Sequence, residues 1–487
     1  MTLLVLAAVA LGTGLATIFL GEQRRGLALA IGIAGSLVVL ALALVMPDTD
    51  SLIVGGVGMV STPVVRAMAV AWSAGLAILG LLEIAVGGRP TVVGPSLIGL
   101  AVAGLALATK DPASSMAALA AGGVAGVVVP GLAGWLDAPN MPSRLPTTNR
   151  GTLAILGSGL LALGVIAWGT SAAGPLGGSG APVSLDPAER LGLGLALLVM
   201  VGAVAIRTGL IPLHVWAARF MEGVSPLAVP AAFAWGSAAF VLVALDWSQV
   251  FLGQEAVGDG ERWLIIVVAM ASVILGGLAA MVHDDIEHVL GYSILQDAAV
   301  AVLAFASLDP DVVAAARNWL VASATVKTAL AAWASVVRTT YGGHRLDDLG
   351  GWARHSPALG VAFAGILVAA IGLPNMALFQ ARTDLVEGAL PGIGAAIALV
   401  IAAMPAIYLG RIAIAGLAPV SPAIAAGLSG RPRWRGGRAA GWSGGPLIQA
   451  IRAIPGELRA NRAPLMALGV LALSVMALLT ATGGAGG

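Results

Sequence analysis

Cysteine is absent from the 487 residues of this chain, and charged side chains are scarce. Without cysteine the chain can form no disulfide and can hold no cysteine-ligated metal or iron–sulfur cluster. Charged residues make up only 10% of the sequence, whereas soluble domains carry about 25%. A chain so poor in charge cannot cover a water-exposed surface. The net charge of +1 gives no indication of nucleic-acid binding.

Apolar residues dominate what is present. Hydrophobic side chains make up 59% of the chain and are collected into long runs. Each run is long enough for a helix that crosses a hydrocarbon core about 30 Å thick. The sequence therefore predicts an all-α integral membrane protein with about fourteen transmembrane helices and no soluble domain of appreciable size. The predicted spans are 2–20, 26–46, 65–86, 92–109, 113–134, 151–169, 190–211, 226–246, 263–282, 289–307, 311–336, 357–385, 392–416 and 463–482.

Basic residues in the connections predict the orientation, because cytoplasmic loops of membrane proteins are rich in Lys and Arg. The loops after odd-numbered spans hold most of them, so we expect both termini on the non-cytoplasmic side and the basic connection 418–461 along the cytoplasmic surface. The first span lacks a basic segment before it, which favours a retained helix over a signal peptide. The basic residues expected in the cytoplasm are Arg24, Arg25, Arg89, Arg144, Arg150, Arg219, Arg338, Arg345, Arg354 and the cluster 431–462.

Several ionisable residues lie within the predicted spans. Arg207, Lys327 and Arg382 follow or interrupt long apolar runs, and Asp297 and Glu83 add two acids. Ionisable groups inside a bilayer are costly and by default indicate an ion or proton pathway. A structural ion pair that locks two helices is the alternative for each site. For Glu83, near the end of its span, we favour the structural interpretation.

Two of the cations lie beside helix-breaking residues. Pro212 lies five residues after Arg207. Pro374, the last residue of the segment Gly372-Leu-Pro374, comes shortly before Arg382. Proline removes a backbone donor and clashes with the preceding turn, so spans 7 and 12 should be interrupted there. Interrupted helices at corresponding positions of two halves are typical of transporters built from inverted repeats.

Four motifs in this part of the chain resemble the antiporter-like subunits of respiratory complex I. The first is Ile206-Arg-Thr-Gly-Leu-Ile-Pro-Leu-His-Val-Trp216 with Met221-Glu-Gly-Val-Ser-Pro226, which is similar to the broken seventh helix of that family. The others are Asp285-Ile-Glu-His-Val-Leu-Gly-Tyr-Ser293, Ala324-Thr-Val-Lys-Thr-Ala-Leu330 and Gly372-Leu-Pro-Asn-Met-Ala-Leu-Phe-Gln-Ala-Arg382. They come in family order. Mrp-type cation/proton antiporters and membrane-bound hydrogenases share the fold.

The resemblance implies a domain organisation and a function. It implies N-terminal helices in 1–110, a first five-helix repeat in 92–246, an inverted second repeat in 263–416, and a C-terminal helix at 463–482. It also implies a midplane line of charged residues that relays protons in a subunit of an NADH-quinone oxidoreductase. The residues expected in this pathway are Arg207, His214, Glu222, Asp297, Lys327, Arg382 and Asp384.

The sequence departs from the family pattern at several of these positions. Arg207 and Arg382 stand where the family has Lys, or Glu at the second position. Arginine is effectively never deprotonated in proteins, so it can supply a fixed field but is a poor proton carrier. The buried Glu of the fifth helix has no counterpart, because 113–134 contains no acid. The Lys of the eighth helix falls near Ser237. Protons then cross by an altered route through Lys327, Asp297 and His214, or the chain is a scaffold with an impaired channel.

An enzymatic site of its own is not expected on this chain. The five histidines are scattered, and His283, Asp284 and Asp285 are interpreted as a cytoplasmic turn rather than a metal site. We expect no cofactor or metal here, redox chemistry in partner subunits, and other membrane subunits and the bilayer of the inner (plasma) membrane as partners. The alternatives are an Mrp-type antiporter or hydrogenase subunit, or a stand-alone secondary transporter. The transported ion is a proton or a monovalent cation such as sodium.

Overall fold

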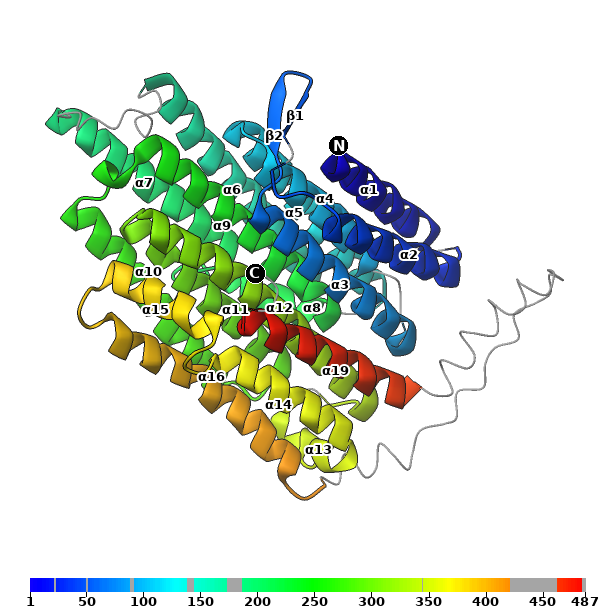
Figure 1. Cartoon of the computed structure of the whole chain (residues 1–487). Coiled ribbons are helices and arrows are strands. Elements are labelled where there is room, and N and C mark those ends of the chain that lie inside the picture. The colour runs from blue at the N-terminus through cyan, green and yellow to red at the C-terminus, as the bar shows by residue number, and fades with distance from the viewer. Residues whose placement is uncertain are drawn as a thin grey trace.

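The computed structural model describes residues 1–21, 23–49, 51–87, 92–137, 144–172, 186–343, 345–420 and 462–483. Most of them belong to long helices that lie side by side in one bundle (Figure 1). Among the described residues, 12 helices are long and apolar enough to cross a membrane. They are α1 (Thr2–Gly21), α2 (Arg25–Leu44), α3 (Pro63–Val86), α5 (Pro112–Asp137), α6 (Arg144–Ala172), α7 (Pro187–Thr208), the helical run Pro226–Leu252 that contains α9 (Gly236–Trp247), α10 (Asp259–Val282), the run Ile286–Ala306 that contains α11 (Ile286–Val302), α12 (Pro310–Tyr341), α16 (Gly394–Leu417) and α19 (Arg462–Ala481).

The two remaining predicted spans also coincide with helices. Span 4 is α4 (Val93–Ala108), which is apolar but only 16 residues long. Span 12 is a pair of helices, α14 (Pro357–Ile371) and α15 (Ala377–Ala389). A short segment, Leu346–His355, which contains α13 (Trp352–His355), meets α14 at an angle of 111°. The expected all-α membrane architecture is therefore confirmed.

Several helices begin where the sequence provides a cap. Thr62 Oγ1 accepts a hydrogen bond of 3.3 Å from the Val65 amide, and Pro63 opens α3. Asp309 caps α12 in the same way through the Asp311 amide, at 2.9 Å, with Pro310 in the first turn. Such caps satisfy amides that have no partner within the helix, and proline at the first position loses nothing.

Spans 7 and 12 are both broken, as predicted. After α7, Gly209 adopts a φ of +69°, and α8 (Val215–Gly223) begins only after Pro212. After α14, Gly372 adopts a φ of +60°, and α15 begins after Pro374. Because successive spans reverse direction, breaks five spans apart lie on helices of opposite direction. This is the geometry of an inverted repeat, while the repeat limits 92–246 and 263–416 stay predictions.

Protein groups satisfy the backbone that the first break releases. The indole Nε1 of Trp216 donates to the Ile206 carbonyl at 3.0 Å. The amide of Ile211 donates to Ser272 Oγ on α10 at 3.2 Å. Freed backbone groups at this depth must face protein or water rather than lipid. The packing of the bundle therefore accommodates the break.

The most buried helix of the bundle is α12. Within its apolar window 94% of residues are buried, against 33% in α1 at the edge of the bundle (Figure 1). The eighth span is α9 extended at both ends by π-helical turns, Pro230–Trp235 and Ser248–Leu252. Single π turns inside α-helices are frequent at functional sites.

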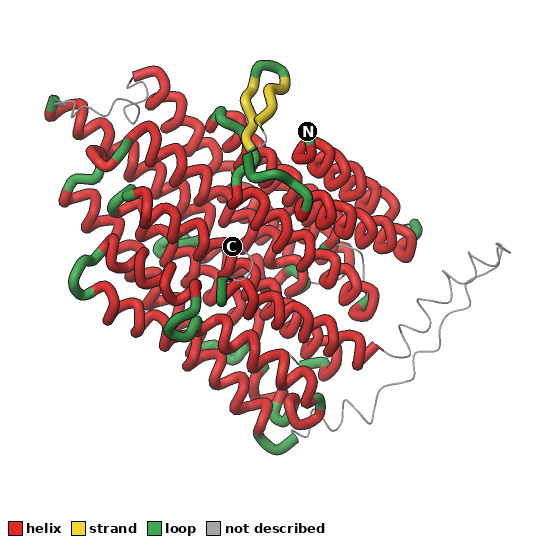
Figure 2. The backbone as a smooth tube through the Cα atoms, viewed as in Figure 1, coloured by secondary structure: helices red, strands yellow, loops and turns green. Residues whose placement is uncertain are grey.

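A β-hairpin that was not predicted connects α2 to α3. Its strands, β1 (Ser51–Val54) and β2 (Val57–Val60), pair antiparallel and project beyond the helix ends (Figure 2). Gly55 and Gly56 form the turn with φ values of +58° and +86°. A tight hairpin of this type needs positive φ at both turn positions, which glycine adopts without steric cost.

Trp168, Trp247 and Trp263 fall at the ends of predicted spans, where an interfacial belt would place them, and the structure divides them into two groups. Trp168 and Trp263 lie near helix ends with exposed rings, as expected for an interfacial belt. The expectation is wrong for Trp247, which is buried and stacks on Phe251 at 5.8 Å between ring centroids. The chain stays helical past this residue to Leu252, so Trp247 does not lie at the end of its span. Of the connection 418–461, residues 421–461 lie outside the described residues, and its placement stays a prediction.

Candidate functional site: a buried ion pair between two broken helices

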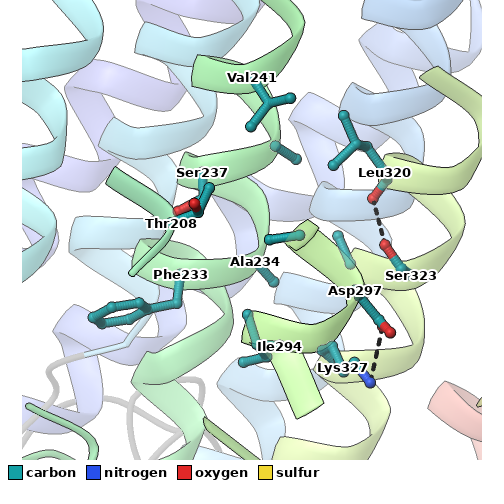
Figure 3. Close-up of a pocket in the computed structure, with 13 residues that line it drawn as sticks. Thr208, Phe233, Ala234, Ser237, Val241, Ile294, Asp297, Leu320, Ser323 and Lys327 are labelled. Carbon is teal, nitrogen blue, oxygen red and sulfur yellow. Dashed lines mark hydrogen bonds and ion pairs between the residues drawn. The ribbon is translucent and has the colours of Figure 1, made fainter. Parts of the chain in front are cut away.

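An ion pair joins α11 and α12 within the bundle. Lys327 Nζ lies 2.9 Å from Asp297 Oδ2, and the two side chains are 2% and 15% exposed. Both residues were predicted to belong to the pathway, and the structure brings them together (Figure 3). Each charge offsets part of the cost of burying the other, and removing one partner would leave the other unpaired.

Tryptophan side chains hold the helices on either side of this pair. Trp319 Nε1 donates to the carbonyl of Asp297 at 2.8 Å, which ties α12 to α11. Trp235 Nε1 donates to Thr328 Oγ1 at 3.0 Å, and its ring stacks on Trp72 of α3 at 5.5 Å between centroids. Buried indoles that find partners for their N–H groups fix the register between helices.

A small cavity with a few polar groups in an otherwise apolar lining lies beside the ion pair (Figure 3). Asp297 and Lys327 line it together with the hydroxyl residues Thr208, Ser237 and Ser323. Thr208 and Ser323 already donate to main-chain carbonyls of their own helices. The buried Ser237 Oγ has no hydrogen-bond partner among the described residues. The cavity has room for a water molecule, which could bridge Ser237 to the charged pair.

Arg207 lies at the end of α7, beside the first break, and is 2% exposed. Its guanidinium points between α5 and α9. A Cβ added to Gly123 would come within 2.3 Å of Nη1, and one added to Gly236 within 3.1 Å of Nη2. The Phe240 ring lies 5.9 Å from Cζ. Nε and Nη1 are buried without a hydrogen-bond partner in the described part of the chain.

Arg382 occupies the corresponding position at the second break. Nη2 donates to the Ile371 carbonyl at 2.9 Å, and Cζ lies 5.0 Å from the centre of the Trp319 ring. Because Trp319 also donates to the Asp297 carbonyl, Arg382 is connected to the ion pair through one indole. Tyr408 on α16, which was not predicted, lies within electrostatic range of Asp297 and Arg382.

The remaining predicted pathway residues lie elsewhere. His214 lies in the first break just before α8, half-buried, with Nδ1 unpartnered among the described residues. It does not line the cavity of Lys327. Asp384 is on the exposed face of α15 with Glu387, away from the buried Arg382. The side chain of Glu222 lies outside the described residues.

Glu83 has a structural position. Its carboxylate accepts hydrogen bonds from the amides of Val92 and Val93 at 3.0 and 3.4 Å, at the start of α4. Arg25 Nη2 donates to the Glu83 carbonyl at 2.8 Å. A carboxylate at a helix N-terminus satisfies unpaired amides and complements the helix dipole. The favoured structural interpretation of Glu83 agrees with this geometry.

The polar turn after α10 is packed against other elements at one end of the bundle. Asp284 pairs with Arg411 of α16 at 2.6 Å, and Asp285 with His288 at 3.5 Å. The His283 and His288 rings stack at 4.6 Å. Within the described residues no group of three or more His, Asp or Glu side chains is placed to hold a metal ion.

Comparison with known proteins gives the family. A family profile described as NADH:quinone oxidoreductase/Mrp antiporter, TM, matches residues 153–406, which is just over half of the chain. The chain belongs to this family. The matched region contains both broken helices, the ion pair and the cavity beside it.

Among curated relatives, subunit N of the NADH-quinone oxidoreductase of Cereibacter sphaeroides is 32% identical over 235 residues, 47% of this chain and 48% of the relative. Subunit N 1 of Streptomyces griseus subsp. griseus is 29% identical over 222 residues, 46% of each chain. The chain thus spans about half the length of the curated relatives it matches.

Solved structures share the fold over nearly the whole chain. A chain of the Mrp complex from Dietzia sp. DQ12-45-1b superposes with a TM-score of 0.73 at 19% sequence identity. The match covers 99% of this chain and 94% of the Dietzia chain. A chain of respiratory complex I from Thermus thermophilus with bound NADH has a TM-score of 0.68, covering 98% and 99% at 17% identity. The predicted family and fold class are both confirmed.

The structure shows what stands at the positions where this member departs from the family pattern. On α5, which lacks the expected Glu, Gly123 lies against the Arg207 guanidinium. Near the expected Lys of the eighth span, Ser237 lines the cavity of the ion pair.

Proposed function

We propose that this chain is the proton-translocating membrane subunit of a complex I-like NADH-quinone oxidoreductase. The observation that carries the proposal is the buried Asp297–Lys327 ion pair, which lines a cavity together with Thr208, the last residue of α7 before the first break. Lys327 is one of only two lysines in the chain. Redox chemistry resides in partner subunits, and this chain converts it into proton movement.

Lys327 is the titrating group in this mechanism. A lysine can release a proton from a buried site at accessible cost, whereas arginine stays charged in nearly any environment. Asp297 holds the ammonium in place at 2.9 Å. Arg207 and Arg382 supply fixed positive fields at the two breaks. A change in the field of a neighbouring subunit then shifts the balance between charged and neutral Lys327.

The proton leaves Lys327 through water in the adjoining cavity. Ser237 Oγ has both its donor and its acceptor capacity free within the described structure, so it can pass a proton to or from such a water. Thr208 connects the cavity to the first break, where His214 lies. The route therefore runs from the break toward the ion pair, with Ser237 near the position of the family's lysine.

Location and partners form part of the same proposal. The subunit lies in the bacterial inner membrane, with its arginine-rich connections in the cytoplasm, both termini on the other side, and further membrane subunits of the complex beside it. The absence of cysteine makes sidedness testable, because one introduced cysteine is the only thiol. A membrane-impermeant maleimide should label Thr2→Cys from the periplasm and Arg345→Cys from the cytoplasm.

A second candidate function rests on Arg207. It replaces a lysine of the family pattern, and no carboxylate of a described residue contacts it. A buried arginine in place of the lysine cannot release its proton. This favours a structural subunit with impaired proton conduction. The alternative of an Mrp-type cation/proton antiporter subunit is distinguished from both by its co-purifying subunits and by transport that depends on sodium.

The decisive experiment uses the intact complex in proteoliposomes, with proton uptake followed by a pH-sensitive dye during quinone reduction. The double variant Lys327→Gln/Asp297→Asn removes both charges of the pair, so neither member is left buried without its partner. We expect it to abolish the proton movement assigned to this subunit. Lys110→Gln is the matched control and should pump normally. Unchanged pumping in an assembled double variant would overturn the relay and favour the structural subunit.

A further inference from the structure

Arg207 is a buried cation, and no described side chain supplies a negative charge in contact with it. Its Nε and Nη1 atoms are buried and unpartnered among them. Lys327, by contrast, pairs with Asp297. The Nε and Nη1 atoms of Arg382 are likewise unpartnered among the described residues, but its Nη2 donates to a carbonyl and its charge lies within electrostatic range of the same acid. A bare charge at this depth is costly unless something neutralises it.

The surroundings of Arg207 leave space next to its donors. A small cavity between α4, α5 and α9 is lined by Arg207, by apolar side chains and by four glycines, Gly99, Gly122, Gly123 and Gly126, among others. A Cβ added to Gly126 would meet nothing within 4 Å. The Nη1 donor is directed at α5, where the backbone of Gly123 packs closely against the guanidinium in a way that no larger residue would allow.

The chemistry of this cavity selects its occupant. Charged N–H donors on one wall and apolar surface on the others favour a single small anion over a cation or an extended molecule. The cavity is of the size of one water-like particle, which excludes a phosphate ester or a lipid headgroup. We propose that it binds a monovalent inorganic anion of chloride size as the counter-ion of Arg207.

The proposal goes beyond proton transport and does not depend on it. An anion here offsets part of the cost of burying the Arg207 charge, which no acid of the fifth span can do because 113–134 contains none. The family's fixed acid would then be replaced by an exchangeable ion. Stability of the chain, rather than pumping, is the property that the anion changes, so the two proposals fail separately.

Bromide is the probe, because it resembles chloride and scatters anomalously. The intact complex is held at constant ionic strength in bromide or in gluconate, an anion too large for the cavity, and the unfolding temperature of this subunit is measured. Binding to the folded state alone should raise it saturably, by about 5 °C. Arg207→Gln should remove this response, while Arg317→Gln, which breaks the surface pair with Asp246, should keep it. A bromide peak should lie within hydrogen-bonding distance of Arg207.

Gly126→Asp keeps the proposal testable if Arg207→Gln does not fold. A tethered carboxylate takes the place of the anion, so this variant should be as stable in gluconate as the parent is in bromide, with no further halide response. A wild-type response in Gly126→Asp, an equal response in Arg207→Gln, or no response in the parent would overturn the proposal. Halide dependence that arises only in Glu222→Gln would also overturn it, by identifying Glu222 as the counter-charge.

Discussion

Arg382 Nη2 on α15 donates a hydrogen bond of 2.9 Å to the carbonyl of Ile371, the last residue of α14. The bond crosses the break in the twelfth span, so one side chain joins the two half-helices and satisfies a carbonyl that the break releases. The same guanidinium lies over Trp319, whose indole donates to the carbonyl of Asp297. The Arg382 side chain at the second break is therefore connected to the Asp297–Lys327 pair through Trp319.

Replacing Arg382 should lower the free energy of unfolding of the protein and should also slow its proton transport. Arg382→Met retains volume but loses the hydrogen bond to Ile371 and the cation over Trp319. A hydrogen bond from a charged group contributes about 1.5–3 kcal/mol, and we expect at least that loss in the free energy of unfolding. Arg317→Gln, at the surface, should cost about 1 kcal/mol or less. Equal effects of the two variants in denaturant unfolding would contradict the role of Arg382 at the break.

Arg207→Lys should preserve or increase proton transport. The substitution restores the residue of the family pattern and provides a side chain that can release its proton, which arginine cannot. The measurement is the initial rate of proton uptake by proteoliposomes with equal amounts of assembled complex. A large decrease in rate with intact assembly would show that a permanent charge at this position is required.

Ser237→Ala should slow proton transport without destabilising the fold. The Ser237 hydroxyl is buried and unpartnered in the described structure, so its removal leaves no protein group unsatisfied and should be neutral or slightly stabilising. Ser323→Ala is the matched control in the same cavity, because that hydroxyl already donates to the Leu320 carbonyl at 3.3 Å. Equal pumping by both variants would remove Ser237 from the route.

Glu83→Ala should affect stability rather than transport. It removes the acceptor for two amides at the start of α4. Leaving such groups unsatisfied costs about 1–3 kcal/mol each, before any water enters. The unfolding temperature should fall, and pumping per assembled complex should stay at the parental level. Lost pumping at an unchanged unfolding temperature would instead place Glu83 in the pathway.

The sequence predicts the breaks well, because their causes are local. Pro212 and Pro374, each with a nearby glycine that adopts positive φ, interrupt otherwise apolar runs. Lys327 and Asp297 could also be singled out, since a charge within an apolar span stands out in composition. Their pairing could not be predicted, because it depends on how α11 and α12 pack along residues thirty positions apart.

Other features depend on packing that leaves little trace in composition. Ser237 is an ordinary small residue in its span, and only the neighbours Lys327 and Thr208 make its hydroxyl part of a cavity with polar groups. Trp247 has the position of an interfacial residue in a hydropathy pattern, yet the π-helical turn after it keeps it inside the bundle. The approach of Arg207 to Gly123 likewise depends on how α5 packs against α9 and on where α7 ends.

Trp235 lies one hydrogen bond from the residue that follows Lys327. Its Nε1 donates to Thr328 Oγ1 at 3.0 Å while its ring stacks on Trp72. The emission wavelength of an indole follows the electric field across its ring, so gain or loss of the neighbouring ammonium charge shifts the light that this pair emits. The protein therefore contains an intrinsic fluorophore beside Lys327, and in a variant that lacks the other ten tryptophans its emission would follow the charge state during turnover without an added dye.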